Sequence, residues 1–280
     1  MRDCIGVDIG GSLIKFVSNQ ESHIYSIDLI EEFLDFLHLF SQKQECFPQI
    51  CFTGGGAVKY RKLIANKLGQ DFRTVDEMEC IVKGMSSYLS HQLTYPFLIV
   101  NIGSGISVLS VKSPQVYHRI TGTALAGSTL RGLVFLITGI QNFSEIIAMA
   151  NSGITSKVDL QVKDIYGTDY EAGRLSGETV AGCLGKILPP GTSTYSQEDV
   201  VASILQMVCE HIGLISSSCA KIERTHRIYF TGGLVEAEIV RNKIEWAISQ
   251  IDEELDIVFR PDSVFVGAFG AKQTAMSLSC

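Results

Sequence analysis

The fold of this chain is decided by residues 4–17, which read CIGVDIGGSLIKFV. An apolar strand ends near Asp8, a glycine-glycine-serine turn follows at residues 10–12, and a second apolar strand carries Lys15. Glycines let backbone N–H groups turn toward an anion, and a carboxylate beside them suits a divalent cation held through water. The stretch therefore indicates a phosphate-handling hairpin, although a Gly-Gly hairpin can also be ordinary turn chemistry.

The same device occurs again further along the chain. Residues 97–109, FLIVNIGSGISVL, have the pattern of an apolar strand, a glycine-serine turn and a return strand. Residues 50–56, ICFTGGG, and residues 227–233, RIYFTGG, are nearly the same buried strand running into a glycine turn. This order, repeated with helices between, predicts two related α/β halves whose glycine turns converge on a central cleft.

The connecting elements follow from hydrophobic periodicity. Apolar residues at helical spacing predict helices at 30–40, 59–68, 77–89, 130–137, 144–151, 176–186, 197–222, 236–251 and 265–278. We divide the chain into an N-terminal α/β half, residues 1–95, and a C-terminal α/β half, residues 96–280. The last helix, about 265–280, is a candidate to pack back on the N-terminal half.

Composition limits the class of protein. The 280 residues are 46% hydrophobic and 19% charged, which is typical of a globular protein with a substantial core. The net charge of -7, without a dense Lys/Arg cluster, argues against a nucleic-acid partner. There is no uncharged apolar run of about 18 residues and no signal-peptide pattern, so we expect no membrane span and a cytoplasmic protein. The eight cysteines contain no CxxC pair, which predicts reduced thiols rather than a zinc site.

The glycine turns resemble the two phosphate motifs and the adenosine motif of the superfamily that contains actin, heat-shock chaperones and sugar kinases. Four segments narrow the resemblance to type II pantothenate kinases: residues 76–84 (DEMECIVKG), 100–107 (VNIGSGIS), 119–123 (RITGT) and 163–170 (KDIYGTDY). They occur in that family's order, and the resemblance covers nearly the whole chain. It implies a two-domain actin-like (ribonuclease H-like) ATPase fold with duplicated halves. It also implies phosphorylation of pantothenate to 4′-phosphopantothenate with ATP and Mg²⁺, the first step of coenzyme A biosynthesis.

The resemblance also implies roles for single residues. Glu77 matches the general base, and a carboxylate suits a primary alcohol whose pKa lies far above neutrality. The positions that match pantothenate-binding residues, partly across a dimer interface, are Ser104, Ser107, Arg119, Tyr166, Val180 and Ala181. The positions that match the ATP and phosphate site are Asp8, Gly10, Gly11, Ser12, Lys15, Gly103, Gly122, Thr123, Gly127, Gly232 and Gly233. Asp8 is the expected Mg²⁺ site, through water.

Several alternatives stay open. Glu77 could serve only the helix dipole, with Glu79 as the other candidate base, and Arg119 or Tyr166 could be ordinary surface or packing residues. The family commonly has a glycine run where this chain reads TALAGST at residues 123–129, so nucleotide or CoA affinity could be weaker.

The rival functions are a kinase of the same superfamily with another small substrate, such as an amino sugar, and a catalytically weak acyl-CoA-binding sensor. The family further implies a homodimer, to whose interface residues 197–222 are candidates to contribute, and feedback by CoA or acyl-CoA.

Overall fold

The computed structural model describes residues 3–69, 72–89, 94–167, 176–188, 194–260 and 262–278. Contacts within the chain group into two compact units, and these do not follow the predicted division at residue 95. Unit 1 comprises Met1–Thr123, Cys219–Glu236 and Leu255–Cys280, whereas unit 2 comprises Ala124–Ser218 and Ala237–Glu254. Both predicted phosphate hairpins therefore belong to unit 1.

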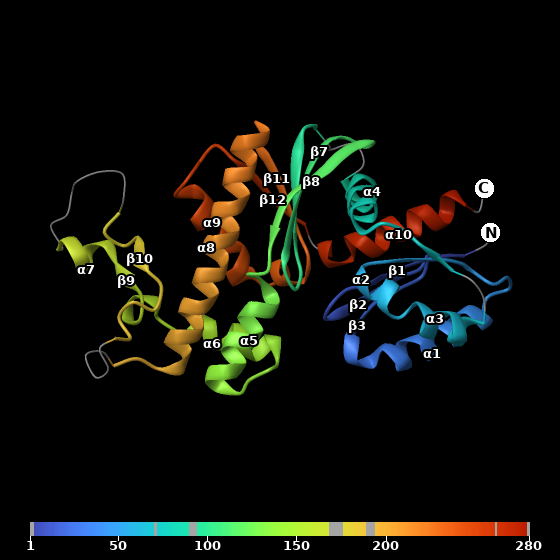
Figure 1. Cartoon of the computed structure of the whole chain (residues 1–280), viewed down its shortest axis with the longest axis horizontal. Coiled ribbons are helices and arrows are strands. Elements are labelled where there is room, and N and C mark those ends of the chain that lie inside the picture. The colour runs from blue at the N-terminus through green and yellow to red at the C-terminus, as the bar shows by residue number, and fades with distance from the viewer. Residues whose placement is uncertain are drawn as a thin grey trace. The chain divides into compact units, whose positions relative to one another are not determined.

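Unit 1 contains two five-stranded sheets of the same topology (Figure 1). The first has the order β3-β2-β1-β4-β5, with β1 (Cys4–Ile9), β2 (Leu13–Val17), β3 (Ser22–Ser26), β4 (Gln49–Thr53) and β5 (Arg73–Thr74). The second has the order β8-β7-β6-β11-β12, with β6 (Phe97–Ile102), β7 (Ile106–Ser113), β8 (Val116–Thr123), β11 (Arg227–Thr231) and β12 (Asp256–Phe259). In each sheet three strands form an antiparallel meander and two more run parallel to its first strand. The predicted duplicated α/β architecture is confirmed.

The strand registers relate the two sheets residue by residue. In the first hairpin Asp8 is paired with Lys15, and Ile9 is paired with Ile14. In the second hairpin Asn101 is paired with Ser107 at the corresponding place. Each central strand therefore carries a polar residue one position before its end, close to a glycine turn, but only the first hairpin carries charge there.

Alternate residues of β1 serve the two faces of the first sheet, as the pleat of a strand requires. The odd-numbered residues from Ile5 to Ile9 face an apolar cluster shared with α1 (Ile30–Gln42) and α3 (Arg61–Leu68). The even-numbered residues face α10 (Val266–Ser277) instead. In Figure 1, α1 and α10 accordingly lie on opposite sides of this sheet.

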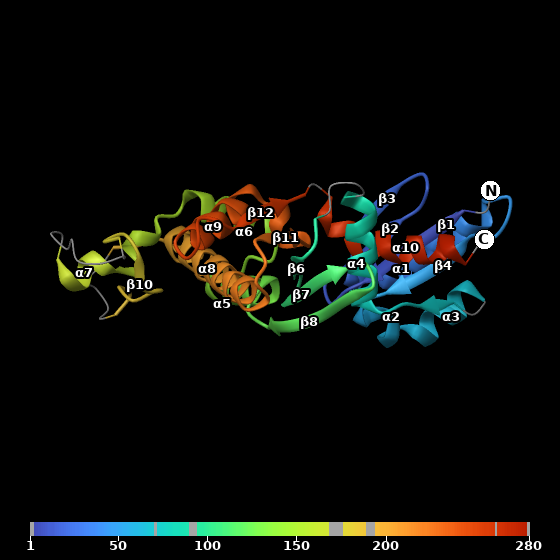
Figure 2. The same ribbon diagram turned by 90° about the horizontal axis from the view of Figure 1, so that it is seen from above.

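Glycines allow α10 to lie very close to its neighbours. A Cβ on Gly270 of α10 would lie 1.8 Å from the backbone of α4 (Glu77–Leu89), and one on Gly84 of α4 would lie 2.0 Å from the backbone of α10. A Cβ on Gly6 of β1 would lie 1.9 Å from the backbone of α10 as well. The last helix therefore packs directly on both β1 and α4, as Figures 1 and 2 show.

Short helices complete unit 1. They are η1 (Ile27–Leu29), α2 (Gly55–Lys59), η4 (Gly233–Glu236) and η5 (Ser263–Phe265). The two that follow the repeated FTGG motif, α2 and η4, begin within or directly after its glycines. The motif therefore ends a buried strand and turns the chain into a helix in both repeats.

Unit 2 is built around α8 (Gln197–Glu223), whose last residues belong to unit 1. Its other elements are α5 (Gly127–Thr138), α6 (Phe143–Ser152), η3 (Thr155–Lys157), β9 (Leu160–Gln161), α7 (Val162–Tyr166), β10 (Val180–Gly182) and α9 (Glu238–Ser249). Within the described residues, α8 is the single helix with the length and hydropathy of a membrane span. Its most apolar stretch of 18 residues is 72% buried inside the fold. The pair α5 and α6 meets the same criteria only across a 74° bend.

Two segments differ from the predicted elements. Residues 176–186 are predicted as a helix, but they form two turns around β10, which pairs antiparallel with β9. Glycine is a poor helix former, and this segment has three glycines, so strand pairing prevails there. Residues 121–123 extend β8, and α5 begins at residue 127 rather than at 130.

The contact between α4 and α10 predicts the effect of adding one methyl group. Gly270→Ala is expected to lower the free energy of unfolding by about 1–3 kcal/mol, because its Cβ has to displace the backbone of α4. Gly132→Ala is the matched control within α5, since among the described residues no atom beyond its chain neighbours and the nearby backbone of its own helix lies within 4 Å of its added Cβ. It is expected to raise stability by up to about 1 kcal/mol. Urea denaturation checks both, and equal midpoints for the two variants would contradict the close packing of α10.

Candidate functional site

The glycine turns of the first and second hairpins, at residues 10–12 and 103–105, meet within unit 1. Ser12 Oγ in the first turn and Ser104 Oγ in the second turn lie 3.0 Å apart and share a hydrogen bond. A Cβ on Gly11 would lie 3.1 Å from the Ser104 hydroxyl oxygen. The approach is therefore close because the first turn has no side chain at that point. The convergence predicted from the repeated turns is present in unit 1.

Asp8 is buried at the end of β1, where the first turn begins. Its Oδ2 accepts a 3.0 Å hydrogen bond from the Lys15 ammonium, and both side chains of this ion pair are at most 15% exposed. A pair at this depth is screened less by solvent than a surface ion pair is. The first hairpin thus holds one negative and one positive charge next to each other.

Two glycines make room for the Asp8 carboxylate. A Cβ on Gly54, after β4, would lie 2.6 Å from its Oδ1, and a Cβ on Gly267, in α10, would lie 2.9 Å from its Oδ2. The N-terminal turn of α10 that carries Gly267 also has the partial positive charge that suits a carboxylate. Neither glycine is among the predicted site residues. The available signals are the repeated FTGG motif and the glycine-rich sequence of the last helix.

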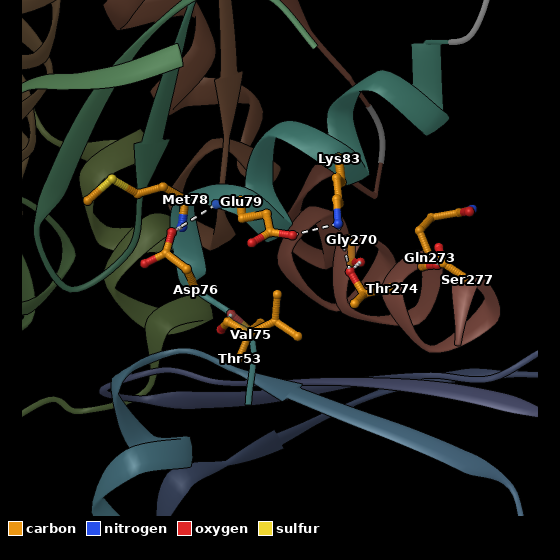
Figure 3. Close-up of polar contacts among 10 residues, drawn as sticks. All are labelled: Thr53, Val75, Asp76, Met78, Glu79, Lys83, Gly270, Gln273, Thr274 and Ser277. Carbon is orange, nitrogen blue, oxygen red and sulfur yellow. Dashed lines mark hydrogen bonds and ion pairs between the residues drawn. The ribbon is translucent and has the colours of Figure 1, made fainter. Parts of the chain in front are cut away.

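Glu77 stands in the first turn of α4. Asp76 Oδ1 accepts 3.0 Å hydrogen bonds from the backbone N–H groups two and three residues further on, which fixes the start of this helix (Figure 3). The segment before α4 is anchored to β4, because Thr53 Oγ1 donates a 3.0 Å hydrogen bond to the Val75 carbonyl. Thr53 is the register partner of Asp8, so this anchor brings Glu77 toward the end of β1.

The electrostatic surroundings of Glu77 place it in the same site as Asp8. The side chain is exposed, yet surrounding protein removes enough water from its carboxyl group to raise its pKa above the ordinary value. The negative charge of Asp8 raises the pKa further, whereas Lys15 lowers it. Asp8 and Lys15 therefore both lie near enough to Glu77 to shift the pKa of its carboxyl group.

Glu79, the other candidate base, has a different partner. Its carboxylate forms an ion pair with the Lys83 ammonium at 2.5 Å, one helical turn further along α4. Lys83 also donates a 3.3 Å hydrogen bond to Thr274 Oγ1 of α10, as Figure 3 shows. Glu79 is therefore tied to the contact between α4 and α10, which leaves Glu77 as the better candidate base.

Arg119 and two other predicted residues are neighbours in the second sheet. Arg119 Nε donates a 3.1 Å hydrogen bond to Ser107 Oγ. A Cβ on Gly122, the register partner of Ser107, would lie 2.0 Å from a terminal nitrogen of Arg119. Gly122 therefore lets the guanidinium lie along the strand. Its planar fork suits a carboxylate.

The second FTGG turn joins the same region. The backbone φ of Gly232 is 106°, and its Cβ would lie 2.2 Å from the Ile102 carbonyl oxygen, so only glycine fits there. A Cβ on Gly233 would lie 3.6 Å from the side chain of Leu13, in the first hairpin. The turns at residues 10–13, 103–105 and 232–233 therefore adjoin one another within unit 1.

The other predicted site residues are distributed differently. Thr123 ends β8 in unit 1, beside Gly122. Four predicted residues belong to unit 2: Gly127 opens α5, Tyr166 ends α7, and Val180 and Ala181 open β10. Residues 168–170 of the predicted KDIYGTDY motif lie outside the described residues. The roles of the residues in unit 2 stay predictions.

The donor set in unit 1 fits a magnesium ion that arrives with a nucleotide. Asp8 and Glu77 offer hard carboxylate oxygens, and Mg²⁺ in such sites takes one or two carboxylates together with phosphate oxygens and water. Because Asp8 is already paired with Lys15, we expect it to hold the ion through water. In the described part of the chain, no three or more His, Cys, Asp or Glu side chains are grouped so that they could hold a metal ion by themselves.

Comparison with known proteins shows the family of the chain. The model of the Fumble family matches residues 18–273. Pantothenate kinase 1 of Arabidopsis thaliana is 31% identical, over 95% of this chain and 84% of its own length. A pantothenate kinase of Schizosaccharomyces pombe is 28% identical, over 95% of this chain and 80% of its own length. Mouse 4′-phosphopantetheine phosphatase is 30% identical over 86% of this chain, which spans only 32% of that longer protein.

Solved structures show the fold. The chain is similar to the ROK hexokinase from Thermus thermophilus, with a TM-score of 0.55, 12% identity and coverage of 99% of this chain and 100% of that one. It is also similar to a ROK family glucokinase from Streptomyces griseus in complex with glucose and AMPPNP, with a TM-score of 0.60, 12% identity and coverage of 98% and 99%. The predicted two-domain, actin-like kinase fold is therefore confirmed.

The shared electrostatics of the site predict how one substitution shifts the titration of Glu77. Lys15→Met is expected to raise the pKa of Glu77, because it removes the cation that favours the ionised carboxylate. Glu77 would then take up its proton at a higher pH. A carbon-13 NMR titration of the glutamate side-chain carboxyls measures this.

Lys83→Met is the matched control, since it removes a lysine that pairs with Glu79 on the same helix. It is expected to leave the pKa of Glu77 unchanged. A pKa of Glu77 in Lys15→Met that stays at the wild-type value, or falls, would show that Lys15 and Glu77 do not share a site.

Proposed function

Since this chain belongs to the Fumble family of type II pantothenate kinases, we propose that it transfers the γ-phosphoryl group of ATP to pantothenate. The products would be 4′-phosphopantothenate and ADP, in the first step of coenzyme A biosynthesis. Family and fold make the chain a pantothenate kinase-like, ATP-dependent phosphotransferase, and pantothenate is the finer part of the proposal. The observation that carries the proposal is the contact between two glycine turns of unit 1 beside the Asp8–Lys15 ion pair, whose charges act on the pKa of Glu77.

The ATP phosphates would lie at the turns formed by residues 10–12 and 103–105. Backbone N–H groups at glycines can approach phosphate oxygens closely, and Lys15 supplies positive charge beside them. The adenosine would lie at residues 232–233, where the second FTGG turn reaches the first hairpin. Magnesium, when bound, would neutralise charge on the phosphates, and Asp8 would hold it through water.

Glu77 would accept the proton of the pantothenate hydroxyl as that oxygen attacks phosphorus. Its raised pKa makes it a stronger base than an ordinary glutamate. The base works only when it is ionised, so kcat would fall as the pH decreases through the raised pKa of Glu77. The rate would recover at higher pH, where the carboxylate is ionised.

The remaining predicted residues would hold pantothenate. Arg119 would bind its carboxylate, with Ser107 orienting the guanidinium through the 3.1 Å hydrogen bond. Ser104 stands where the two hairpins touch, so its hydroxyl would lie between the transferred phosphoryl group and the acceptor. Tyr166, Val180 and Ala181 would line the pantothenyl pocket. We further propose a cytoplasmic homodimer with CoA or an acyl-CoA as feedback ligand.

A catalytically weak acyl-CoA sensor is the second candidate, and the loop at residues 124–128 favours it. Where the family commonly has glycines, the chain has Ala126, which is buried just before α5. Thr129 Oγ1 donates a 2.8 Å hydrogen bond to the Ala124 carbonyl, so the start of the loop is hydrogen-bonded to the first turn of α5. Reduced backbone freedom there would weaken phosphate binding. Binding of acetyl-CoA without any turnover of ATP would favour this candidate.

A kinase assay with matched variants tests the proposal. The wild-type chain is expected to produce ADP from MgATP with pantothenate, and not with a panel of amino sugars or with 4′-phosphopantetheine. Glu77→Gln is expected to lower kcat by about a hundredfold or more, because a general base is lost. Nucleotide affinity would change little, since the glycine turns and Lys15 remain.

Glu79→Gln is the control, because it changes a carboxylate on the same helix that pairs with Lys83. Its kcat is expected to stay close to the wild-type value. Near-normal turnover by Glu77→Gln would show that Glu77 is not the general base. If the wild-type chain preferred another acceptor, the proposal that pantothenate is the substrate would be wrong.

A further inference from the structure

A small module of unit 2 is attached to the long helix α8 by carboxyl groups. The module consists of η3, β9, α7 and β10, which lie beside α8 in Figure 1. At its start, Asp199 of α8 accepts hydrogen bonds from the Ile154 backbone N–H at 2.7 Å and from the Lys157 ammonium at 3.1 Å. Asp199 is buried, so this first attachment is shielded from water.

The second attachment is Asp159, which is fully buried. Its Oδ1 accepts a short hydrogen bond from Ser203 Oγ of α8 and a 2.8 Å hydrogen bond from the Leu184 backbone N–H. Asp159 directly precedes β9, and Leu184 closely follows β10. One carboxyl oxygen therefore ties both strands to the helix. Ser203 is one turn along α8 from Asp199, so both attachments use the same helix face.

The turn after β10 depends on this carboxyl group. Leu184 has a φ of 58°, a left-handed conformation that leucine rarely adopts, and its N–H points to Asp159. A Cβ on Gly185 would lie 2.7 Å from the Leu160 side chain, so the turn packs tightly on β9. The Lys186 backbone N–H then donates a 2.8 Å hydrogen bond to the Val158 carbonyl. The residues before and after Asp159, Val158 and Leu160, thus both contact the turn that follows β10.

The module carries the residues proposed to line the pantothenyl pocket. Val180 and Ala181 are in β10, and α7 follows β9 without a break and ends at Tyr166. Tyr166 is 65% exposed and is the last residue of α7, which belongs to the module. The position of all three residues therefore depends on how the module is held.

Stability alone does not account for Asp159. Its Oδ2 is buried and has no hydrogen-bond partner among the described residues. A buried polar atom without a partner is unfavourable, and such atoms in a folded protein call for an explanation. The two hydrogen bonds that Oδ1 makes among α8, β9 and β10 are a reason for a carboxyl group at this position despite that cost, because a smaller side chain could not reach all three.

We infer that Asp159 is a positioning residue for the pantothenyl pocket, which it serves by fixing on α8 the module that carries Tyr166, Val180 and Ala181. The inference rests on the proposed function, since the pocket is that of the proposed substrate. Asp159 does not touch the reacting atoms. Its effect is on the geometry of substrate binding, so it acts on the KM for pantothenate and not on the KM for ATP.

Steady-state kinetics of four variants test the inference. Asp159→Ala removes both hydrogen bonds and is expected to raise the KM for pantothenate about tenfold or more, with the KM for ATP within about twofold. Asp159→Asn keeps an acceptor oxygen and is expected to restore most of the affinity. Ser203→Ala removes one of the two hydrogen bonds, so its KM is expected to lie between the wild-type value and that of Asp159→Ala.

Ser216→Ala is the matched control, because Ser216 is a buried serine of α8 whose hydroxyl donates a 2.6 Å hydrogen bond within the helix, to the Ile212 carbonyl. It is expected to leave both KM values unchanged. Parallel increases in both KM values in Asp159→Ala, or a KM for pantothenate that does not move, would overturn the inference. So would an equal effect of Ser216→Ala.

Hydrogen exchange separates this inference from the proposed function. In Asp159→Ala, amide exchange is expected to accelerate at residues 158–163 and 180–186 and to stay unchanged in the rest of unit 2. A wild-type chain that does not phosphorylate pantothenate would refute the proposed function. In that case, local acceleration would still support the positioning role of Asp159, whereas unchanged or uniformly faster exchange would overturn it.

Discussion

The close packing of α10 against both β1 and α4 is the constraint on which unit 1 depends. The residues at positions 6, 84 and 270 are glycines, so there is no side chain where these elements touch. Their backbones lie so close that even one methyl group at any of these positions would clash with the neighbouring backbone. The same helix brings Gly267 to the Asp8 carboxylate. Since α4 begins with Glu77, one packing arrangement sets both the acid at the end of β1 and the candidate base.

The duplicated sheets share a topology but not a charge pattern, and the difference suits a division of labour. The first hairpin pairs Asp8 with Lys15, which under the proposed function would provide a cation for phosphate and a carboxylate for a hydrated metal ion. The second has Asn101 and Ser107 at the corresponding register positions, and Ser107 bonds to Arg119. A neutral hairpin beside an arginine suits an organic acid. Under the proposed function, the glycine turns of both repeats would contact the triphosphate, the charged pair would come from the first repeat, and Arg119 of the second would recognise the acceptor.

The fold was largely predictable because its main signals are local. Each strand pattern, each glycine turn and the helical period of α8 can be recognised from residues that are close in the sequence. The repetition of the strand and turn patterns indicates the duplication. Long-range contacts were not predictable in this way. Gly54 and Gly267 are far apart in the sequence and meet only at Asp8, and the tie between Asp159 and Ser203 joins a short strand to a distant helix. Residues 180–182, within the predicted helix 176–186, form a strand because β9 is available to pair, which periodicity alone does not reveal.

A crystal structure of the chain with Mg²⁺, AMPPNP and pantothenate tests the central claim most directly. The account predicts that the triphosphate contacts both the turn at residues 10–12 and the turn at residues 103–105. It also predicts that a Glu77 carboxyl oxygen lies about 3 Å from the primary hydroxyl of pantothenate. A nucleotide bound to only one of the two turns, or a pantothenate hydroxyl out of reach of Glu77, would contradict it.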